Sequence, residues 1–217
     1  MSDLFQAIDI YCERRMIGLW AEPLNALSNV SFLIAAWLLW RHYKSLKLHD
    51  TQCTILIGLV AKVGIGSLLF HTFANRISML ADVIPIMAFA CYYLWLALRR
   101  LIRVNKLKAT SLLAMFMFAG AYADKVPPQL SFNGSIAYFP CLVSILMMGA
   151  YLRTRQRPEA PLLLQAGFIF LISLGFRSSD MVLCEFLPIG VHFLWHALNG
   201  VVLYLLSKAI IINCARQ

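Results

Sequence analysis

Long apolar stretches alternate with short polar segments along nearly the whole chain. A helix that crosses a membrane needs about 20 mostly apolar residues, and seven stretches come close to that length. They cover about residues 23–40, 53–71, 78–98, 107–123, 132–152, 161–176 and 187–212. The pattern predicts an all-α membrane protein in which residues 1–217 form one seven-transmembrane helix bundle, with residues 1–22 as a polar segment ahead of the first span.

Composition supports a membrane protein. Of the 217 residues, 61% are hydrophobic and 13% are charged, against about 25% charged residues in a typical soluble domain. The net charge of +9 is carried mainly by the short segments between the apolar stretches. Basic residues there contact anionic lipid surfaces and set the orientation of the helices. The positive charge therefore does not indicate nucleic-acid binding.

Basic residues gather in every second polar segment. Thirteen lie near the ends of the first, third, fifth and seventh spans: Arg41, Lys44, Lys47, Arg99, Arg100, Arg103, Lys106, Lys108, Arg153, Arg155, Arg157, Lys208 and Arg216. Five fall on the opposite side: Arg14, Arg15, Arg76, Lys125 and Arg177. Cytoplasmic segments carry the excess of Lys and Arg, so we expect the N-terminus outside and the C-terminus in the cytoplasm.

Three histidines and two other polar residues fall within the apolar spans. His192 and His196 are four residues apart, so their imidazoles share one face of a helix. His71 ends the second span, Ser67 precedes it by one turn, and Asp82 follows eleven residues later. In the predicted orientation all five lie in the outer half of the membrane, whereas the remaining two histidines fall in an inner segment.

These five residues suit a hydrolytic zinc site. A catalytic zinc ion commonly takes three protein ligands and leaves the fourth position to water. We assign His71, His192 and His196 as the ligands. Asp82 is the candidate general base and acid, and Ser67 the candidate donor to the developing oxyanion. The outer-half placement and the residue types together predict a metal-dependent hydrolase.

Other interpretations of the histidines stay open. An intramembrane histidine can simply form hydrogen bonds to a neighbouring helix, and a lipid receptor can hold zinc as a structural ion. A haem site is a third alternative. The His192–His196 pair favours one small ion over haem, because two histidines that ligate one haem approach it from opposite faces.

Several short motifs resemble one family. In chain order they are Tyr11-Cys12-Glu13, Glu22-x2-Asn25-x3-Asn29, Gly64-x-Gly66-Ser67-x3-His71, Asp180-x3-Cys184-Glu185 and His192-x2-Trp195-His196. As an ordered set they resemble alkaline ceramidases, which belong to a membrane hydrolase superfamily with the adiponectin receptors and GPI-remodelling proteins. The likeness covers nearly the whole chain.

The resemblance implies a seven-helix zinc amidase that cleaves ceramide-like lipids to a sphingoid base and a fatty acid. An ester hydrolase acting on another lipid is the alternative within enzymes, since the same metal, water and oxyanion donor serve both. The resemblance also implies a disulfide between Cys12 and Cys184, which an oxidising outer compartment permits.

A calcium site in the N-terminal segment is a further implication of the resemblance, with Asp9, Glu13 and Glu22 as candidate ligands. Calcium takes oxygen ligands, but Arg15 stands where the family has an asparagine. An ion pair from Arg14 or Arg15 to Glu22 is the alternative means of tethering the segment. A solvated surface segment is the third interpretation.

Lys62 is the nineteenth basic residue and falls in the middle of the second span. A charge at that depth is expected to face the bundle interior, a water-filled cavity or a polar group of the substrate. The short chain with few soluble segments favours a bacterial inner membrane, with the site facing the periplasm. In a eukaryote the same orientation would face the lumen of the ER or Golgi.

Overall fold

The computed structural model describes residues 2–16, 18–123 and 125–216, and helices dominate them. The α-helices are α1 (Pro23–Ser28), α2 (Val30–Ser45), α3 (Thr51–Phe73), α4 (Arg76–Leu96), α5 (Lys106–Ala123), α6 (Phe139–Thr154), α7 (Ala160–Leu183) and α8 (His192–Cys214). Helices α1 and α2 follow each other within one apolar span, Pro23–Ser45. A π-helical turn, Ala97–Leu101, extends α4, and a 3-10 turn, Ser135–Tyr138, precedes α6.

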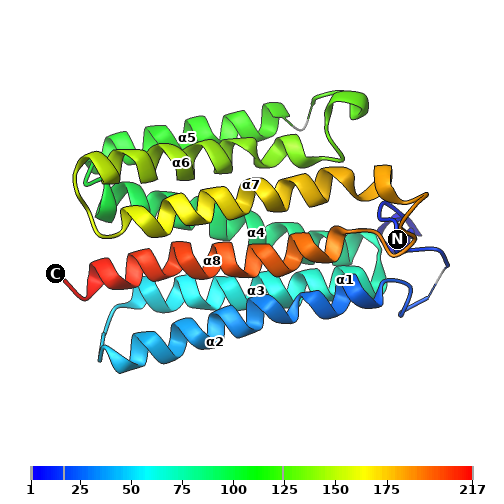
Figure 1. Cartoon of the computed structure of the whole chain (residues 1–217), viewed down its shortest axis with the longest axis horizontal. Coiled ribbons are helices and arrows are strands. Elements are labelled where there is room, and N and C mark those ends of the chain that lie inside the picture. The colour runs from blue at the N-terminus through cyan, green and yellow to red at the C-terminus, as the bar shows by residue number, and fades with distance from the viewer. Residues whose placement is uncertain (1, 17, 124, 217) are drawn as a thin grey trace.

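The helices run along one long axis and pack as a bundle (Figure 1). Helix α8 contacts α7 on one side and α2 on the other, and α3 packs between α2 and α4. Many of the fully buried side chains at these contacts are aliphatic, such as Leu39 of α2, Leu56 of α3 and Ile210 of α8. Large apolar side chains also cover the outside, including Ile84 and Phe168. An apolar exterior suits contact with lipid tails.

Among the described residues, six helical segments are long and apolar enough to cross a membrane: Pro23–Ser45, Thr51–Phe73, Arg76–Leu101, Ser135–Thr154, Ala160–Leu183 and His192–Cys214. The chain is therefore a multi-pass integral membrane protein. Helix α5 coincides with the predicted fourth span, but it is not among the six. It has only 18 residues, and Lys106 and Lys108 occupy its first turn. A seventh crossing through α5 stays a prediction.

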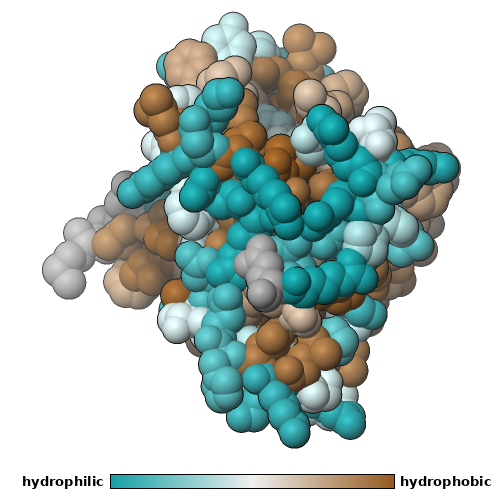
Figure 2. All heavy atoms as spheres, turned by 90° about the vertical axis from the view of Figure 1, so that its left-hand side faces the viewer, coloured by the Kyte–Doolittle hydropathy of each residue, from teal (hydrophilic) through white to brown (hydrophobic). Residues whose placement is uncertain are grey.

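The two ends of the bundle differ in charge. The segments that join α2 to α3, α4 to α5 and α6 to α7 lie at the end where the C-terminus lies (Figure 1). These segments and the helix ends beside them carry the thirteen basic residues assigned above to one side. Figure 2 shows this end of the molecule, and hydrophilic side chains cover much of it. The N-terminal segment lies at the opposite end.

Three predicted helix boundaries are wrong at the end opposite the basic residues. Helix α7 continues to Leu183 instead of ending near residue 176, so Arg177 and Asp180 are helical residues and Arg177 does not belong to an outer loop. Helix α8 begins at His192 rather than near residue 187. Helix α6 begins at Phe139, not near residue 132. Hydropathy located the apolar parts, but buried polar side chains allow α7 to continue beyond them.

Lys62 also departs from expectation. It lies near the middle of α3, and its side chain is exposed on the outer surface of the bundle. It does not line the cavity that Ser67, Asp82, His192 and His196 share. Lys62 therefore does not face the bundle interior, where it would meet a carboxylate or the substrate.

Candidate metal centre

Three buried histidines converge near the end of the bundle opposite the basic residues. His71 lies in the last turn of α3, while His192 and His196 occupy the first two turns of α8. One ligand nitrogen from each lies within 4.8 Å of the other two. The ring centroid of His71 is 5.4 Å from that of His192 and 4.6 Å from that of His196. His71 thus meets two histidines that follow it by 121 and 125 positions in the sequence.

Glu22 orients His71. Oε2 of Glu22 lies 2.6 Å from Nδ1 of His71, and since a carboxylate only accepts hydrogen bonds, Nδ1 carries the proton. Burial acts to raise the pKa of Glu22, but its contacts with His71, Asn25 and Arg14 outweigh burial and hold that pKa below its usual value. Nε2 of His71 is left buried, has no hydrogen-bond partner among the described residues, and is available to bind a metal.

Ser28 plays the same part for His196. The Ser28 hydroxyl donates its proton to the carbonyl oxygen of Asn25 at 2.8 Å. Its oxygen lies 2.8 Å from Nδ1 of His196 and therefore accepts from that nitrogen. Nε2 of His196 is then the nitrogen with a free lone pair. Nδ1 of His192 is also buried, and it has no hydrogen-bond partner within the described part of the chain.

This arrangement fits a metal ion. Buried polar atoms normally have hydrogen-bond partners. The unpartnered nitrogens of His71 and His192 lie close together, which indicates that a bound ligand satisfies them. A carboxylate behind a ligating histidine fixes its tautomer and increases its basicity, as Glu22 does here. The donor set of three imidazoles suits zinc, with room for water as a further ligand. The cluster is therefore a candidate metal centre.

Asp180 holds the start of α8 in place. Its Oδ1 accepts hydrogen bonds from the backbone N–H groups of Val191 at 2.7 Å and His192 at 2.9 Å. Its Oδ2 accepts from the backbone N–H of Cys12 at 3.1 Å. Carboxylates stabilise helix N-termini because the first N–H groups have no partner within the helix. Asp180 thereby fixes His192 relative to α7 and to the N-terminal segment.

The N-terminal segment covers the histidines. Cys12 and Cys184 form the disulfide that the resemblance implied. The ring of Tyr11 stacks on His192, with ring centroids 3.9 Å apart. Burial raises the pKa of Tyr11, although the neighbouring guanidinium of Arg177 opposes that shift. The disulfide and the stacked ring tie residues 11 and 12 to the site.

The calcium interpretation gains no support. Glu13 accepts hydrogen bonds from the backbone N–H groups of Leu24 at 2.7 Å and Asn25 at 2.8 Å. Burial raises the pKa of Glu13, although these two hydrogen bonds oppose the shift. Glu22 forms an ion pair with Arg14 at 2.5 Å, which is the tethering alternative given above, and Asp9 is exposed. Within the described residues, these three carboxylates do not form a group spaced for one ion.

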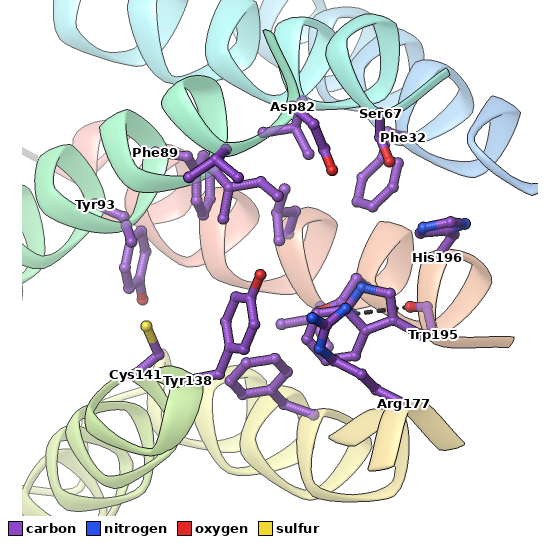
Figure 3. A pocket seen from close by; sticks show the side chains of 18 of the residues that line it. Phe32, Ser67, Asp82, Phe89, Tyr93, Tyr138, Cys141, Arg177, Trp195 and His196 are labelled. Carbon is purple, nitrogen blue, oxygen red and sulfur yellow. Dashed lines mark hydrogen bonds between the residues drawn. The ribbon is translucent and has the colours of Figure 1, made fainter. Parts of the chain in front are cut away.

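Ser67 and Asp82 face one cavity with His192 and His196. Both point into the same space in Figure 3, from α3 and α4 respectively. Gly66 allows this approach, because a Cβ there would overlap the carbonyl oxygen of Ala81 and lie 3.2 Å from Cα of Asp82. Oδ1 of Asp82 is buried and has no hydrogen-bond partner within the described structure. A carboxylate of this kind is available to a ligand.

The cavity has a volume of about 220 Å³ and a largely apolar lining. It extends along α4 from Met79 to Leu94, and residues of α3, α6, α7 and α8 also line it. Arg177 of α7 also lines it, beside His192 and His196. The sequence interpretation missed Arg177 and Ser28 as site residues. A basic residue directly after an apolar stretch, three positions before Asp180, was the available signal for Arg177.

Fold and site together define a polytopic membrane protein with a buried three-histidine centre beside an apolar cavity. In the comparison with protein families, the family model described as Ceramidase matches residues 8–216. The chain therefore belongs to this family. The predicted likeness to alkaline ceramidases is thereby confirmed, and membership implies an amide hydrolase acting on ceramide. No curated protein matches the chain.

Proposed function

We propose that this protein is a zinc-dependent intramembrane hydrolase that cleaves the amide bond of ceramide-like lipids to a sphingoid base and a fatty acid. One observation carries the proposal. The ligand nitrogens of His71, His192 and His196 lie within 4.8 Å of one another, and two of these histidines line an apolar cavity with Ser67 and Asp82.

Each residue has a role that follows from its position. His71, His192 and His196 would hold the zinc ion, which when bound activates water and polarises a carbonyl. Asp82, with a buried oxygen that lacks a partner, takes a proton from the attacking water and returns it to the leaving amine. The Ser67 hydroxyl donates a hydrogen bond to the carbonyl oxygen as negative charge develops there.

The shape of the cavity suits a lipid chain. Its lining residues on α4 run from Met79 to Leu94, and 15 steps at a helical rise of about 1.5 Å span about 22 Å. That exceeds half of the bilayer hydrocarbon core, which is about 30 Å thick. Apolar side chains from α4, α6 and α8 line this length. An acyl chain in the cavity would have its carbonyl group at the histidine end.

We also propose that the histidine end faces the outside. The basic residues gather at the opposite end, and cytoplasmic segments carry the excess of Lys and Arg. The disulfide between Cys12 and Cys184 lies at the histidine end, and disulfides persist in oxidising compartments. In a bacterium this end faces the periplasm.

Substitution of Asp82 by asparagine tests the proposed chemistry. We expect Asp82→Asn to lower the release of fatty acid from ceramide by about 10²–10⁴-fold, the usual worth of general acid–base catalysis. Zinc content and thermal stability should stay near those of the wild type, because Asp82 is not a ligand. The measurement is turnover and zinc content on the same purified samples.

Asp9→Asn is the matched control, since Asp9 is an exposed carboxylate of the N-terminal segment. It should keep full turnover. Unchanged turnover in Asp82→Asn would contradict the role of Asp82. Zinc binding without turnover of any lipid amide or ester in the wild type would favour the alternative, a lipid receptor with a structural zinc ion.

A further inference from the structure

Arg177 is a charged residue within the cavity that the hydrolytic mechanism does not use. It lies on α7, one turn before Asp180, and its side chain lines the cavity with Asp82, His192 and His196. In Figure 3 its guanidinium group points into the space between Trp195 and Tyr138. Ser67 and Asp82 lie across this space in the same view.

Two aromatic rings hold the guanidinium group in place. Its central carbon is 5.3 Å from the ring centroid of Tyr138 and 5.4 Å from that of Trp195. Nη1 donates to the hydroxyl oxygen of Tyr11 at 3.3 Å. All three contacts are with neutral groups. They orient the charge without neutralising it.

Among the described residues, Arg177 forms no ion pair with a carboxylate. Asp82 lines the same cavity, but its carboxylate is not within ion-pair distance of the Arg177 guanidinium. The Nε atom is buried and has no hydrogen-bond partner. A guanidinium stays charged in any protein environment, and an unpaired charge inside a membrane protein is expensive and usually functional. The guanidinium that carries this vacant donor lines the cavity.

We propose that Arg177 binds the carboxylate group of a long-chain lipid in the cavity. The inference rests on the proposed function for the identity of the lipid. A guanidinium offers two parallel N–H donors that match a carboxylate. One cation in an apolar lining suits a monoanion, whereas a phosphate with up to two charges would call for further cations. Arg177 is then a specificity-determining residue of the cavity.

Either the product or the substrate of lipid amide hydrolysis can supply this carboxylate. Hydrolysis of a lipid amide converts the acyl carbonyl into the carboxylate of the released fatty acid, and Arg177 would retain that product. Alternatively, the substrate itself carries a carboxylate on its amine portion, as an N-acyl amino acid does. The two sources share one recognition chemistry and are separated by experiment.

The first arm measures binding without turnover. Hexadecanoate and hexadecanol have the same chain, and only hexadecanoate carries a charge. We expect the purified wild type to bind hexadecanoate at least about tenfold more tightly than hexadecanol. A charge-assisted hydrogen bond accounts for a difference in affinity of that size. Metal ions also attract carboxylates, so the measurement is repeated after a chelator has removed the metal. The preference for hexadecanoate should persist. Arg177→Gln should lose the preference while hexadecanol binding is unchanged.

Two further variants serve as references. Arg177→Lys keeps the charge but loses the paired donors, so its preference should fall between those of the wild type and Arg177→Gln. Arg155→Gln removes an arginine that also stacks over a tyrosine, Tyr151, but at the basic end. It should keep the full preference. Equal affinity of the wild type for the two lipids overturns the proposal whether or not any variant folds.

The second arm identifies the source of the carboxylate. N-hexadecanoylglycine and N-hexadecanoylethanolamine differ in one carboxylate on the amine portion. A selective loss of kcat/KM for the glycine conjugate in Arg177→Gln assigns the carboxylate to the substrate. Loss of product inhibition by hexadecanoate, with both substrates unaffected, assigns it to the product. If neither parameter changes, the proposal is overturned. Failure of turnover in every protein would contradict the proposed function but leave the binding arm intact.

Discussion

Each histidine of the candidate metal centre is oriented by a residue from another part of the chain. Glu22 contacts His71, Ser28 contacts His196, and Asp180 binds the backbone N–H of His192. Glu22 and Ser28 fix the tautomer and the ring orientation of their histidines, so metal affinity depends on them nearly as much as on the ligands. Asp180 fixes the backbone position of His192. The site is therefore built from the N-terminal segment, α1, α3, α7 and α8.

The contact between Glu22 and His71 gives a prediction about metal affinity. Glu22→Gln keeps the shape but replaces a charged acceptor with a neutral one, so we expect the affinity for zinc to fall by about 10–100-fold. Competition with a chelator measures it. Ser28→Ala should weaken zinc binding less, because Ser28 is a neutral partner. An affinity in Glu22→Gln equal to that of the wild type would refute the orienting role of Glu22.

The sequence predicted the residues of the cluster but not all of their partners. The four-residue spacing of His192 and His196 and the outer-half placement of His71 were sufficient to expect one site. Glu22 was expected to bind calcium or an arginine, and the structure pairs it with Arg14 and His71 together. Arg177 was assigned to an outer loop. Such contacts between distant segments depend on helix rotation and register, which hydropathy does not report.

At the scale of the helices, close packing of α3 against α4 positions Asp82. Gly66 faces the backbone at Ala81 and leaves no room for a Cβ. Small residues at helix contacts let backbones approach closely in membranes. The adjacent Ser67 is buried, and it reaches the same cavity as Asp82 because the two helices are this close.

Alanine at Gly66 should separate the two helices. We expect Gly66→Ala to lower the free energy of unfolding by about 1–3 kcal/mol, the usual cost of overpacking, and to reduce turnover by displacing Asp82 from Ser67. Gly58→Ala on the same helix is the control, since nothing lies within 4 Å of a Cβ there. It should be neutral or stabilising by about 0.5–1 kcal/mol. Thermal unfolding in detergent compares the two, and equal stability would refute the packing argument.

Helix boundaries show where sequence patterns are sufficient and where they are not. At the basic end, prediction and structure agree within a few residues for α3, because Asp50 accepts from the backbone N–H of Cys53 and caps that helix. At the histidine end α7 continues past Phe176 through Arg177 and Asp180. Both side chains are polar and face inward: Arg177 lines the cavity and Asp180 accepts hydrogen bonds from the start of α8. The polarity that predicted a loop therefore belongs to the interior of the bundle.

At the scale of the whole molecule, the two ends differ in chemistry. One end carries the basic segments, and the other carries the disulfide, the N-terminal segment and the histidines. The polarity predicts which end meets the cytoplasm. The candidate metal centre lies at the end that carries the disulfide, and we predict that this end lies in the outer half of the membrane.

Cysteine labelling in intact cells tests this orientation. His49 lies in the exposed segment between α2 and α3, and Gln129 lies between α5 and α6. We expect a membrane-impermeant maleimide to label Gln129→Cys in intact cells and His49→Cys only after the membrane is permeabilised. The parent protein corrects for its own free cysteines. The reverse labelling pattern would contradict the proposed orientation.

The measurement that tests the central claim most directly is the zinc content of detergent-purified protein, wild type beside His196→Ala, with ceramide turnover assayed on the same samples. The account predicts about one zinc ion per chain in the wild type, in keeping with a single three-histidine site, and loss of both zinc and fatty acid release in the variant. Turnover of ceramide by wild-type protein that contains no zinc, or by His196→Ala at the wild-type rate, would contradict it.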